Sequence, residues 1–339
     1  MASSIILTRE KNGNMTFDFD VLCVGNAIMD VLSPCDDAFL KDHNIEKGGM
    51  NLIDEARALS LYEAMPEPTQ QSGGSAANSA YGLACLGGRA AFAGQVAADP
   101  VGDAFIADLQ AANVHFAGRQ AQDGPATARS MIFVTPDTIR SMNTFLGSSL
   151  HLNADHLSNS ITAKYIYLEG YLFDAPKGPE IFQKAAEIAA ATGGKIALSL
   201  SDAWCVERHF DALGEFIEEH VSILFSNHDE IKALGYDTIF DASDALNEVV
   251  DDIIVTQGEA GAMVATSEQT VSVPAMPVGE VVDTTGAGDL FAAGYLYGKS
   301  TGADILSAAE YASICAGEII CHFGARPQSD LKEHISRYK

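Results

Sequence analysis

Positively charged side chains are scarce in this sequence. Its 339 residues include 20 Lys and Arg against 46 Asp and Glu, which gives a net charge of -26. Nucleic acid and anionic membrane surfaces would repel such a chain, so we expect neither as a partner. We interpret the acidity as a source of solubility. A phosphorylated ligand would have to overcome this negative field locally, which points to a metal cation beside it.

Several sequence patterns are also absent. None of the six cysteines forms a C-x-x-C pair, and those in apolar runs predict buried thiols, a reducing compartment and a cytoplasmic protein. No run of about 20 strongly apolar residues occurs, so we expect no membrane span. The P-loop pattern G-x-x-x-x-G-K-[ST] is missing, and G-x-G-x-x-G does not follow the first predicted strand. A P-loop NTPase and a dinucleotide-binding dehydrogenase are therefore disfavoured.

Short apolar runs alternate with helix-like segments along most of the chain, and this order predicts a mainly parallel α/β sheet covered by helices. The predicted strands are 19–25, 90–96, 165–168, 195–200, 223–225 and 253–256, with an antiparallel edge pair at 261–265 and 270–273. The predicted helices are 76–86, 102–112, 179–192, 213–219, 229–234, 242–250, 288–298 and 303–320.

Two irregular segments, 33–70 and 118–150, interrupt this pattern. We read both as strand-like, the second with a turn at Pro136-Asp137. They bracket a Gly73-Gly74 motif, so we expect them to form a small β lid on a single domain covering 19–328, with 1–18 as a tail. The alternative is two unrelated surface loops.

The most informative motif is Asp283–Asp289, which reads DTTGAGD and precedes an apolar, helix-forming run. Such a turn exposes backbone N–H groups at a helix N-terminus, where an anion is favoured. Asp289 would not help to bind an anion, but it suits a base that takes a proton during phosphoryl transfer. No Lys or Arg occurs between 233 and 298, so backbone amides, a metal or a distant Arg must supply positive charge. The alternative is a tight turn with an ordinary first-turn acid.

Gly73–Asn78 and Asp283–Asp289 together resemble the two signatures of the ribokinase-like (PfkB) family of carbohydrate and nucleoside kinases. The resemblance spans roughly residues 19–328. It implies an α/β ribokinase-like fold, with a Rossmann-like three-layer core, a mainly parallel central sheet and a small β lid. It also implies a phosphotransferase in which Asp289 is the base and Gly286, Ala287 and Gly288 form an anion hole.

The resemblance extends to the nucleotide side. Asn227-His228-Asp229-Glu230 is similar to the family's Asn-x-x-Glu motif, which implies that Glu230 holds Mg²⁺ through water. An ordinary capped helix start is the alternative. The residues that the resemblance assigns to ATP are Asn227, Thr256, Gly258, Gly261 and Gly324. A monovalent cation such as K⁺ near Asp283 and Thr285 is a further implication.

On the acceptor side, a carboxylate and an amide suit the vicinal hydroxyls of a ribose. The residues assigned to the acceptor are Asp30, Gly74, Asn78, Met142 and Leu172, with Tyr171 as another candidate for packing on a base. Asp30 is expected just beyond the end of the first strand. Arg140 would reach the transferring phosphoryl group and supply the missing cation. The alternative for Met142, Tyr171 and Leu172 is ordinary core packing. Asn78 could instead be a helix-cap or turn residue, and Arg140 a solvated arginine at the end of a hairpin.

Residues 25–30 and 73–79, with Arg140-Ser141-Met142, resemble the adenosine kinase branch of the family. The implied function is ATP-dependent phosphorylation of the 5′-hydroxyl of a nucleoside, adenosine to AMP. A sugar kinase acting on ribose, fructose or 2-keto-3-deoxygluconate is the nearest alternative, and a non-catalytic nucleotide sensor is one from another class. The partners implied are ATP and a small nucleoside or sugar, for a monomer or a homodimer.

Overall fold

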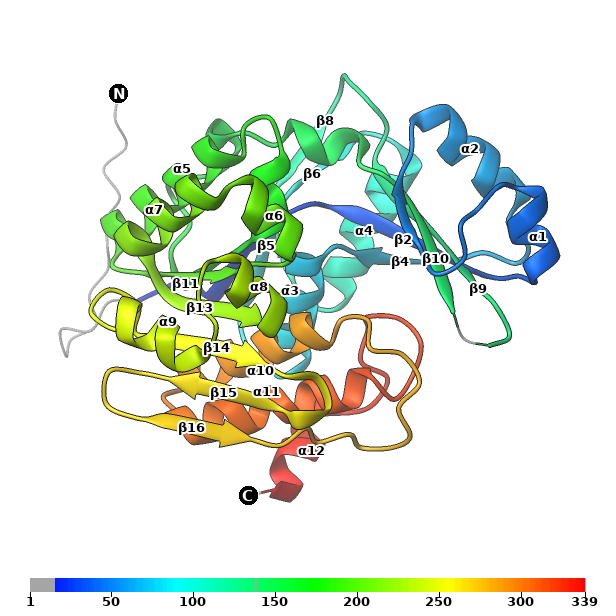
Figure 1. The fold of residues 1–339 in the computed structure, drawn as a ribbon. Helices are drawn as coiled ribbons and strands as arrows, with labels where there is room; N and C mark the ends of the chain where they lie inside the picture. Colours follow the sequence, from blue (N-terminus) through cyan, green and yellow to red (C-terminus); the bar gives the residue numbers. More distant parts are fainter. Residues whose placement is uncertain (1–15, 138, 339) are drawn as a thin grey trace, which may run out of the picture.

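The central sheet of the computed structural model is built from short apolar strands (Figure 1), in the part of the chain that the structure describes, residues 16–137 and 139–338. Seven strands run parallel, and two antiparallel strands close one edge. Their spatial order is β16 (Thr270–Val273), β15 (Ala262–Ala265), β14 (Asp252–Thr256), β13 (Val221–Asn227), β12 (Lys195–Ser199), β11 (Ala163–Glu169), β1 (Phe19–Val24), β5 (Ala90–Ala93) and β7 (His115–Phe116).

Helices cover both faces of this sheet. Within β1, Val21 and Cys23 enter one apolar cluster while Leu22 and Val24 enter another, as the alternation of a strand buried on both sides requires. The first cluster includes residues of α3 (Ser75–Cys85), α4 (Pro100–Ala111), α10 (Ala287–Thr301) and α11 (Ile305–Ile319). The second includes residues of α5 (Gly178–Thr192), α6 (Ala203–Arg208), α7 (Phe210–His220), α8 (His228–Ala233) and α9 (Ile239–Leu246). The result is three layers.

A second, five-stranded sheet projects from one end of the core (Figure 1). Its order is β3 (Met50–Leu52), β10 (Arg140–Phe145), β9 (Ala128–Val134), β2 (Ile28–Pro34) and β4 (Thr69–Gly73). The strands come from two parts of the chain, since β9 and β10 form an antiparallel hairpin and β2 pairs with β9. An α/β ribokinase-like core with a mainly parallel sheet and a small second sheet is thus confirmed.

The segment 33–70 is more helical than we predicted. It contains α1 (Asp37–Asp42) and α2 (Glu55–Ala64). Each helix begins after an aspartate whose side chain accepts a backbone N–H: Asp36 from Phe39 and Asp54 from Arg57, both at 2.8 Å. These caps are the local signal that fixes where the helices begin.

The predicted strand 90–96 is also broken. It divides at Gly94 into β5 and β6 (Gln95–Ala97), and β6 leaves the central sheet to pair with β8 (Arg119–Ala121). A Cβ on Gly94 would lie 2.7 Å from the Gly25 carbonyl oxygen, so this crossing needs glycine. The sequence analysis did not predict α6 or the last helix, α12 (Leu331–Tyr338).

Four short 3₁₀ turns complete the described elements: η1 (Gly147–His151), η2 (Ala154–His156), η3 (Gly170–Asp174) and η4 (Gly258–Ala260). Of the predicted tail 1–18, residues 1–15 lie outside the described part of the chain. Among the described helices, none is long and apolar enough to cross a membrane.

Candidate active site

Asp289 lies in the first turn of α10, directly after the Gly286–Gly288 turn. Its carboxylate is held by α3, because Ser75 Oγ donates to Oδ1 at 2.6 Å and Asn78 Nδ2 donates to Oδ2 at 2.8 Å. Ser79 Oγ donates to the Asp289 carbonyl oxygen at 3.0 Å. The two signatures, far apart in the sequence, therefore meet through side chains. Sequence reasoning quoted Ser75 but gave it no role.

The electrostatics of Asp289 suit a proton acceptor. Burial raises the pKa of its carboxyl above the ordinary value, while the hydrogen bonds from Ser75 and Asn78 and the charge of Arg326 act in the opposite direction. A carboxylate with a raised pKa accepts a proton more readily than an exposed one. The amide oxygen of Asn78 is buried and has no hydrogen-bond partner.

Asp30 lies in β2, a strand of the second sheet, and not just beyond the first strand as the sequence suggested. Its carboxylate sits against Gly73, where an added Cβ would be 2.3 Å from Oδ2. Burial raises its pKa to about 6, Arg140 and Arg326 lower it, and Asp289 raises it. Asp30 and Asp289 therefore influence each other's charge, although Asp30 lies in a strand of the second sheet and Asp289 in helix α10 of the core.

Arg140, in β10, is paired with the first aspartate of the DTTGAGD motif. Its Nη1 lies 2.6 Å from Asp283 Oδ2, and both side chains are buried. Burial alone would raise the pKa of Asp283, but Arg140 and the bonds from Thr285 and Gly324 hold it below the ordinary value. The pair joins the second sheet to the turn before α10. It also places a buried guanidinium beside that turn, in a region without basic residues of its own.

Glu169, at the end of β11, is a site residue that sequence reasoning missed. Its Oε1 accepts from the backbone and side-chain nitrogens of Asn26 at 2.7 and 2.8 Å, and Oε2 accepts from Ala76 N at 2.8 Å. Burial raises its pKa to about 7. One carboxylate thus fastens the chain between β1 and β2 to the start of α3. The only sequence signal was a lone acid at the end of an apolar strand.

The predicted nucleotide-side residues gather at the carboxyl ends of neighbouring strands. Asn227 ends β13 and is the register partner of Thr256, which ends β14. Gly258 and Gly261 follow in the turn to β15. Gly324 donates its N–H to Asp283 Oδ2 at 3.3 Å, which places it beside the turn before α10. Ligands of open α/β sheets bind at this edge.

Glu230 is engaged with its own helix start. Asn227 donates to its carboxylate from N at 3.0 Å and from Nδ2 at 2.6 Å, and Glu230 N donates back to Asn227 Oδ1. Burial raises its pKa to about 7, and the nearby Asp202 and Asp229 act in the same direction. Glu230 forms no ion pair with another described residue, so the negative charge of these carboxylates is not neutralised there. An oxygen donor set of this kind fits Mg²⁺, which keeps several waters.

The residues predicted to cover a base differ in position. Met142 is half-buried in β10, beside Arg140. Tyr171 is 38% exposed, and its pKa is raised by burial and by the carboxylates of Asp202, Asp289 and Glu230. Carboxylates of both the acceptor side and the nucleotide side therefore act on its hydroxyl. Leu172 is fully buried in the core cluster that contains α5, so the structure gives it core packing.

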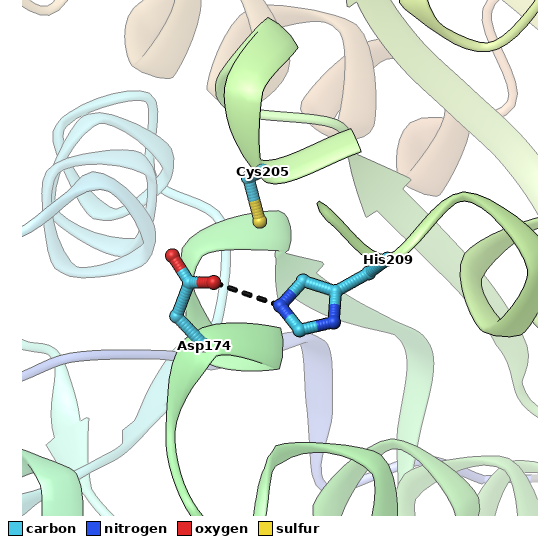
Figure 2. A group of neighbouring side chains, drawn as sticks. All are labelled: Asp174, Cys205 and His209. Carbon is cyan, nitrogen blue, oxygen red and sulfur yellow. Dashed lines mark hydrogen bonds and ion pairs between the residues drawn. The ribbon is translucent and has the colours of Figure 1, made fainter. Parts of the chain in front are cut away.

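A second polar cluster consists of Asp174, Cys205 and His209 (Figure 2), whose donor atoms all lie within 4.8 Å of one another. His209 Nε2 is 2.8 Å from Asp174 Oδ1, and Arg208 Nε donates to the same oxygen at 3.1 Å. Burial raises the pKa of the Cys205 thiol to about 12, and the thiol donates to the Gly170 carbonyl. Because Arg208 already neutralises Asp174, the cluster braces η3 against α6 and does not need a metal.

This three-layer core, with a mainly parallel sheet and a small second sheet, is that of ribokinase-like phosphotransferases. The model of the pfkB family carbohydrate kinases matches residues 50–332. The crystal structure of a probable sugar kinase from Rhizobium etli is 41% identical, with a TM-score of 0.86, over 95% of this chain and 99% of that one. The structure of adenosine kinase from Sinorhizobium meliloti is 40% identical, with a TM-score of 0.86, over 95% and 100%.

A curated relative, adenosine kinase 2 of Arabidopsis thaliana, is 24% identical over 83% of this chain and 87% of its own length. The chain belongs to the pfkB family of carbohydrate kinases and is a phosphotransferase. This family generally uses Mg-ATP.

Proposed function

We propose that this kinase transfers the γ-phosphoryl group of ATP to the 5′-hydroxyl of a nucleoside, with adenosine as the preferred acceptor. The observation that carries the proposal is the Asp289 carboxylate, held by Ser75 and Asn78 at the N-terminus of α10. A base placed beside an anion-binding turn can take the hydroxyl proton where the phosphoryl group arrives. The residue roles below rest on this geometry.

In this mechanism the acceptor hydroxyl lies between Asp289 and the γ-phosphorus. Asp289 takes the proton of the acceptor hydroxyl while the hydroxyl oxygen attacks the γ-phosphorus in line. The backbone N–H groups of Gly286, Ala287 and Gly288 stabilise the charge on the transferred phosphoryl group. Asp30 and the unpartnered oxygen of Asn78 bind the sugar hydroxyls, with the backbone of Gly74 beside them. Arg140 exchanges its Asp283 contact for the phosphoryl oxygens as the second sheet closes over the site and excludes water.

Glu230 would hold Mg²⁺ through water, with Asp202 and Asp229 adding to the local negative field. When bound, the cation supplies positive charge to the polyphosphate. Asn227, Thr256, Gly258, Gly261 and Gly324 line the path of the nucleotide at the carboxyl ends of the strands. Glu230 itself stays fixed by the Asn227 cap.

A nucleoside acceptor is favoured by the apolar Met142 and the aromatic Tyr171 near Arg140 and Asp289, because a purine needs such surfaces to pack on. It is also favoured by the likeness to the Sinorhizobium meliloti adenosine kinase. The similar likeness to a probable sugar kinase favours a free sugar as the second candidate. Both acceptors would use the same base.

The test is ADP production from Mg-ATP with adenosine, guanosine, inosine, cytidine, ribose, fructose and 2-keto-3-deoxygluconate. We expect turnover with adenosine to exceed that with each sugar. Turnover with a free sugar alone would keep the Asp289 mechanism and overturn the nucleoside. ATP binding without any phosphorylated product would overturn catalysis and favour a nucleotide sensor.

The Glu230→Gln substitution should weaken Mg²⁺ dependence without unfolding the chain. Gln keeps an acceptor for Asn227 but removes the charge, so the Mg²⁺ concentration for half-maximal rate should rise by about 10- to 100-fold. A magnesium titration of ADP production, with calorimetry of Mg-ATP binding, measures this. The control is Glu248→Gln, the same change at an exposed carboxylate after α9, which should leave the titration unchanged. Equal titrations of Glu230→Gln and wild type would remove Glu230 from the metal site.

A further inference from the structure

Arg326 is a buried cation between the C-terminal loop and the second sheet. It is 9% exposed and follows α11 by seven residues. Its Nη2 donates to the carbonyl and the hydroxyl oxygen of Ser72, the latter at 2.6 Å. Its guanidinium also lies over the ring of Tyr81 in α3, 4.1 Å from the centroid. A planar guanidinium suits this combination of stacking and hydrogen bonding, and an ammonium does not.

Asp108 and Asp30 lie near enough to Arg326 to act on its charge, but neither forms an ion pair with it. Its Nε and Nη1 are buried without a hydrogen-bond partner, and no carboxylate of the described residues forms an ion pair with it. Burial lowers its pKa, while Asp108 and Asp30 act to raise it. Asp108 also binds Ser72, accepting its backbone N–H at 2.9 Å. A structural anchor alone would not need a buried positive charge, because a neutral donor could bind Ser72.

The loop that carries Arg326 touches both halves of the site. Gly324 N donates to Asp283, and Ala325 packs against Gly286, where an added Cβ would lie 2.8 Å from that of Ala325. On the other side, Ser72 directly precedes Gly73-Gly74. Gly74 is the N-cap residue of α3, the helix that presents Ser75 and Asn78 to Asp289. The loop therefore spans from the anion-binding turn to the junction between β4 and α3.

We propose that Arg326 is a positioning residue for phosphoryl transfer: its guanidinium, bound to Ser72 and stacked on Tyr81, fixes the Gly73-Gly74 junction relative to the Gly286 turn. The inference rests on the proposed function. The charge of Arg326 also lowers the pKa of the Asp30 and Asp289 carboxyls, which favours their ionised forms. The charged or titratable groups that face Asp289 or respond to it are Asp30, Tyr167, Glu169, Tyr171 and Arg326.

Arg326→Gln and Arg326→Lys separate the charge from the geometry. We expect kcat to fall roughly 10- to 100-fold in Arg326→Gln, because the base and the turn lose their relative placement. The fall in kcat at low pH should move to higher pH in Arg326→Gln and stay in place in Arg326→Lys, which keeps the charge. Arg337→Gln, a change of the same type in an exposed arginine of α12, should match wild type.

Hydrogen exchange provides a readout that needs neither substrate nor activity. Amides of residues 69–76 should exchange about tenfold faster in Arg326→Gln than in wild type, because the junction loses its anchor. If Arg326→Gln does not fold, Ser72→Ala and Asp108→Asn, which leave the cation in place, should accelerate the same amides. Wild-type exchange together with a wild-type pH profile would overturn the inference. Wild type inactive on every acceptor would contradict the proposed function, and exchange would still decide the anchoring role.

Discussion

Asp289→Asn should reduce turnover by about 10²- to 10⁴-fold with little change in acceptor affinity. The amide is nearly the same size as the carboxylate but cannot take a proton. It also fits the same partners, because its oxygen can accept from Asn78 Nδ2 while its nitrogen donates to Ser75 Oγ. Steady-state kinetics of purified wild type and variant measure the effect. Near-normal kcat in Asp289→Asn would reject Asp289 as the base.

The pH dependence gives this prediction a second test. Because the pKa of Asp289 is raised, kcat of the wild type should fall as pH drops through that value and the carboxylate becomes protonated. Ser75→Ala removes a hydrogen bond that lowers the pKa, so it should move this fall to higher pH. An unchanged pH profile in Ser75→Ala would contradict the electrostatic role of the bond.

The Asp289→Asn substitution should lower activity but should not lower the stability of the folded protein at neutral pH. A carboxyl whose folded pKa lies above its unfolded value contributes stability that is present at low pH and is lost as pH rises through the folded value. Asp289 is such a group, so Asp289→Asn should unfold at an equal or higher temperature than wild type at neutral pH. Thermal unfolding of both proteins at acidic and neutral pH measures this. A marked loss of stability would mean that the kinetic effect reflects misfolding.

Gly286→Ala should reduce kcat/KM by about 10²- to 10³-fold, the effect of misplacing donors that stabilise a transition state. Gly286 is the N-cap residue of α10, with φ 78° and ψ 0°, a left-handed conformation that alanine adopts at a cost of about 1 kcal/mol. Its Cβ would also meet Ala325 at 2.8 Å. The turn must shift to relieve this contact, and its N–H groups shift with it.

Gly302 provides the matched control for this substitution. It ends the same helix with φ 82° and ψ 21°, and no atom lies within 4 Å of its added Cβ. Gly302→Ala therefore introduces the left-handed strain without a clash and away from the site. It should lower stability by about 1 kcal/mol and keep wild-type kinetics. Wild-type kinetics in Gly286→Ala would show that the phosphoryl group is not held by this turn.

Local sequence signals were enough to predict the strands of the central sheet apart from the two-residue edge strand β7 (His115–Phe116). The strands that become β11 to β14 are short apolar runs flanked by turn residues, and their alternation with helices leaves few arrangements other than a parallel sheet. The second sheet was predicted only in outline. The helices α1 and α2 beside it begin directly after the N-cap residues Asp36 and Asp54. Aspartate is a common N-cap, but in a short polar segment it does not show by itself that a helix will form.

The candidate site divides in the same way. Asp289 and the Gly286–Gly288 turn are adjacent in the chain, so their chemistry can be read from one motif. Asp30 was expected just beyond the end of the first strand and lies within β2, because nothing local shows that the chain after β1 continues as a strand of the second sheet. Leu172 was assigned to a base, yet it is fully buried in the core cluster that contains α5, and a single apolar residue does not reveal whether it faces the core or a ligand.

The sequence by itself determined the class of this protein, since the parallel α/β core and the glycine-rich turn that carries Asp289 both follow from short-range patterns. Only the tertiary structure decided which side chains surround that carboxylate. The contacts of Ser75 with Asp289, Arg140 with Asp283, Asn26 with Glu169 and Ser72 with Arg326 each join residues 140 or more positions apart. Such contacts depend on how helices and sheets pack, and packing is set by the shape of the whole core.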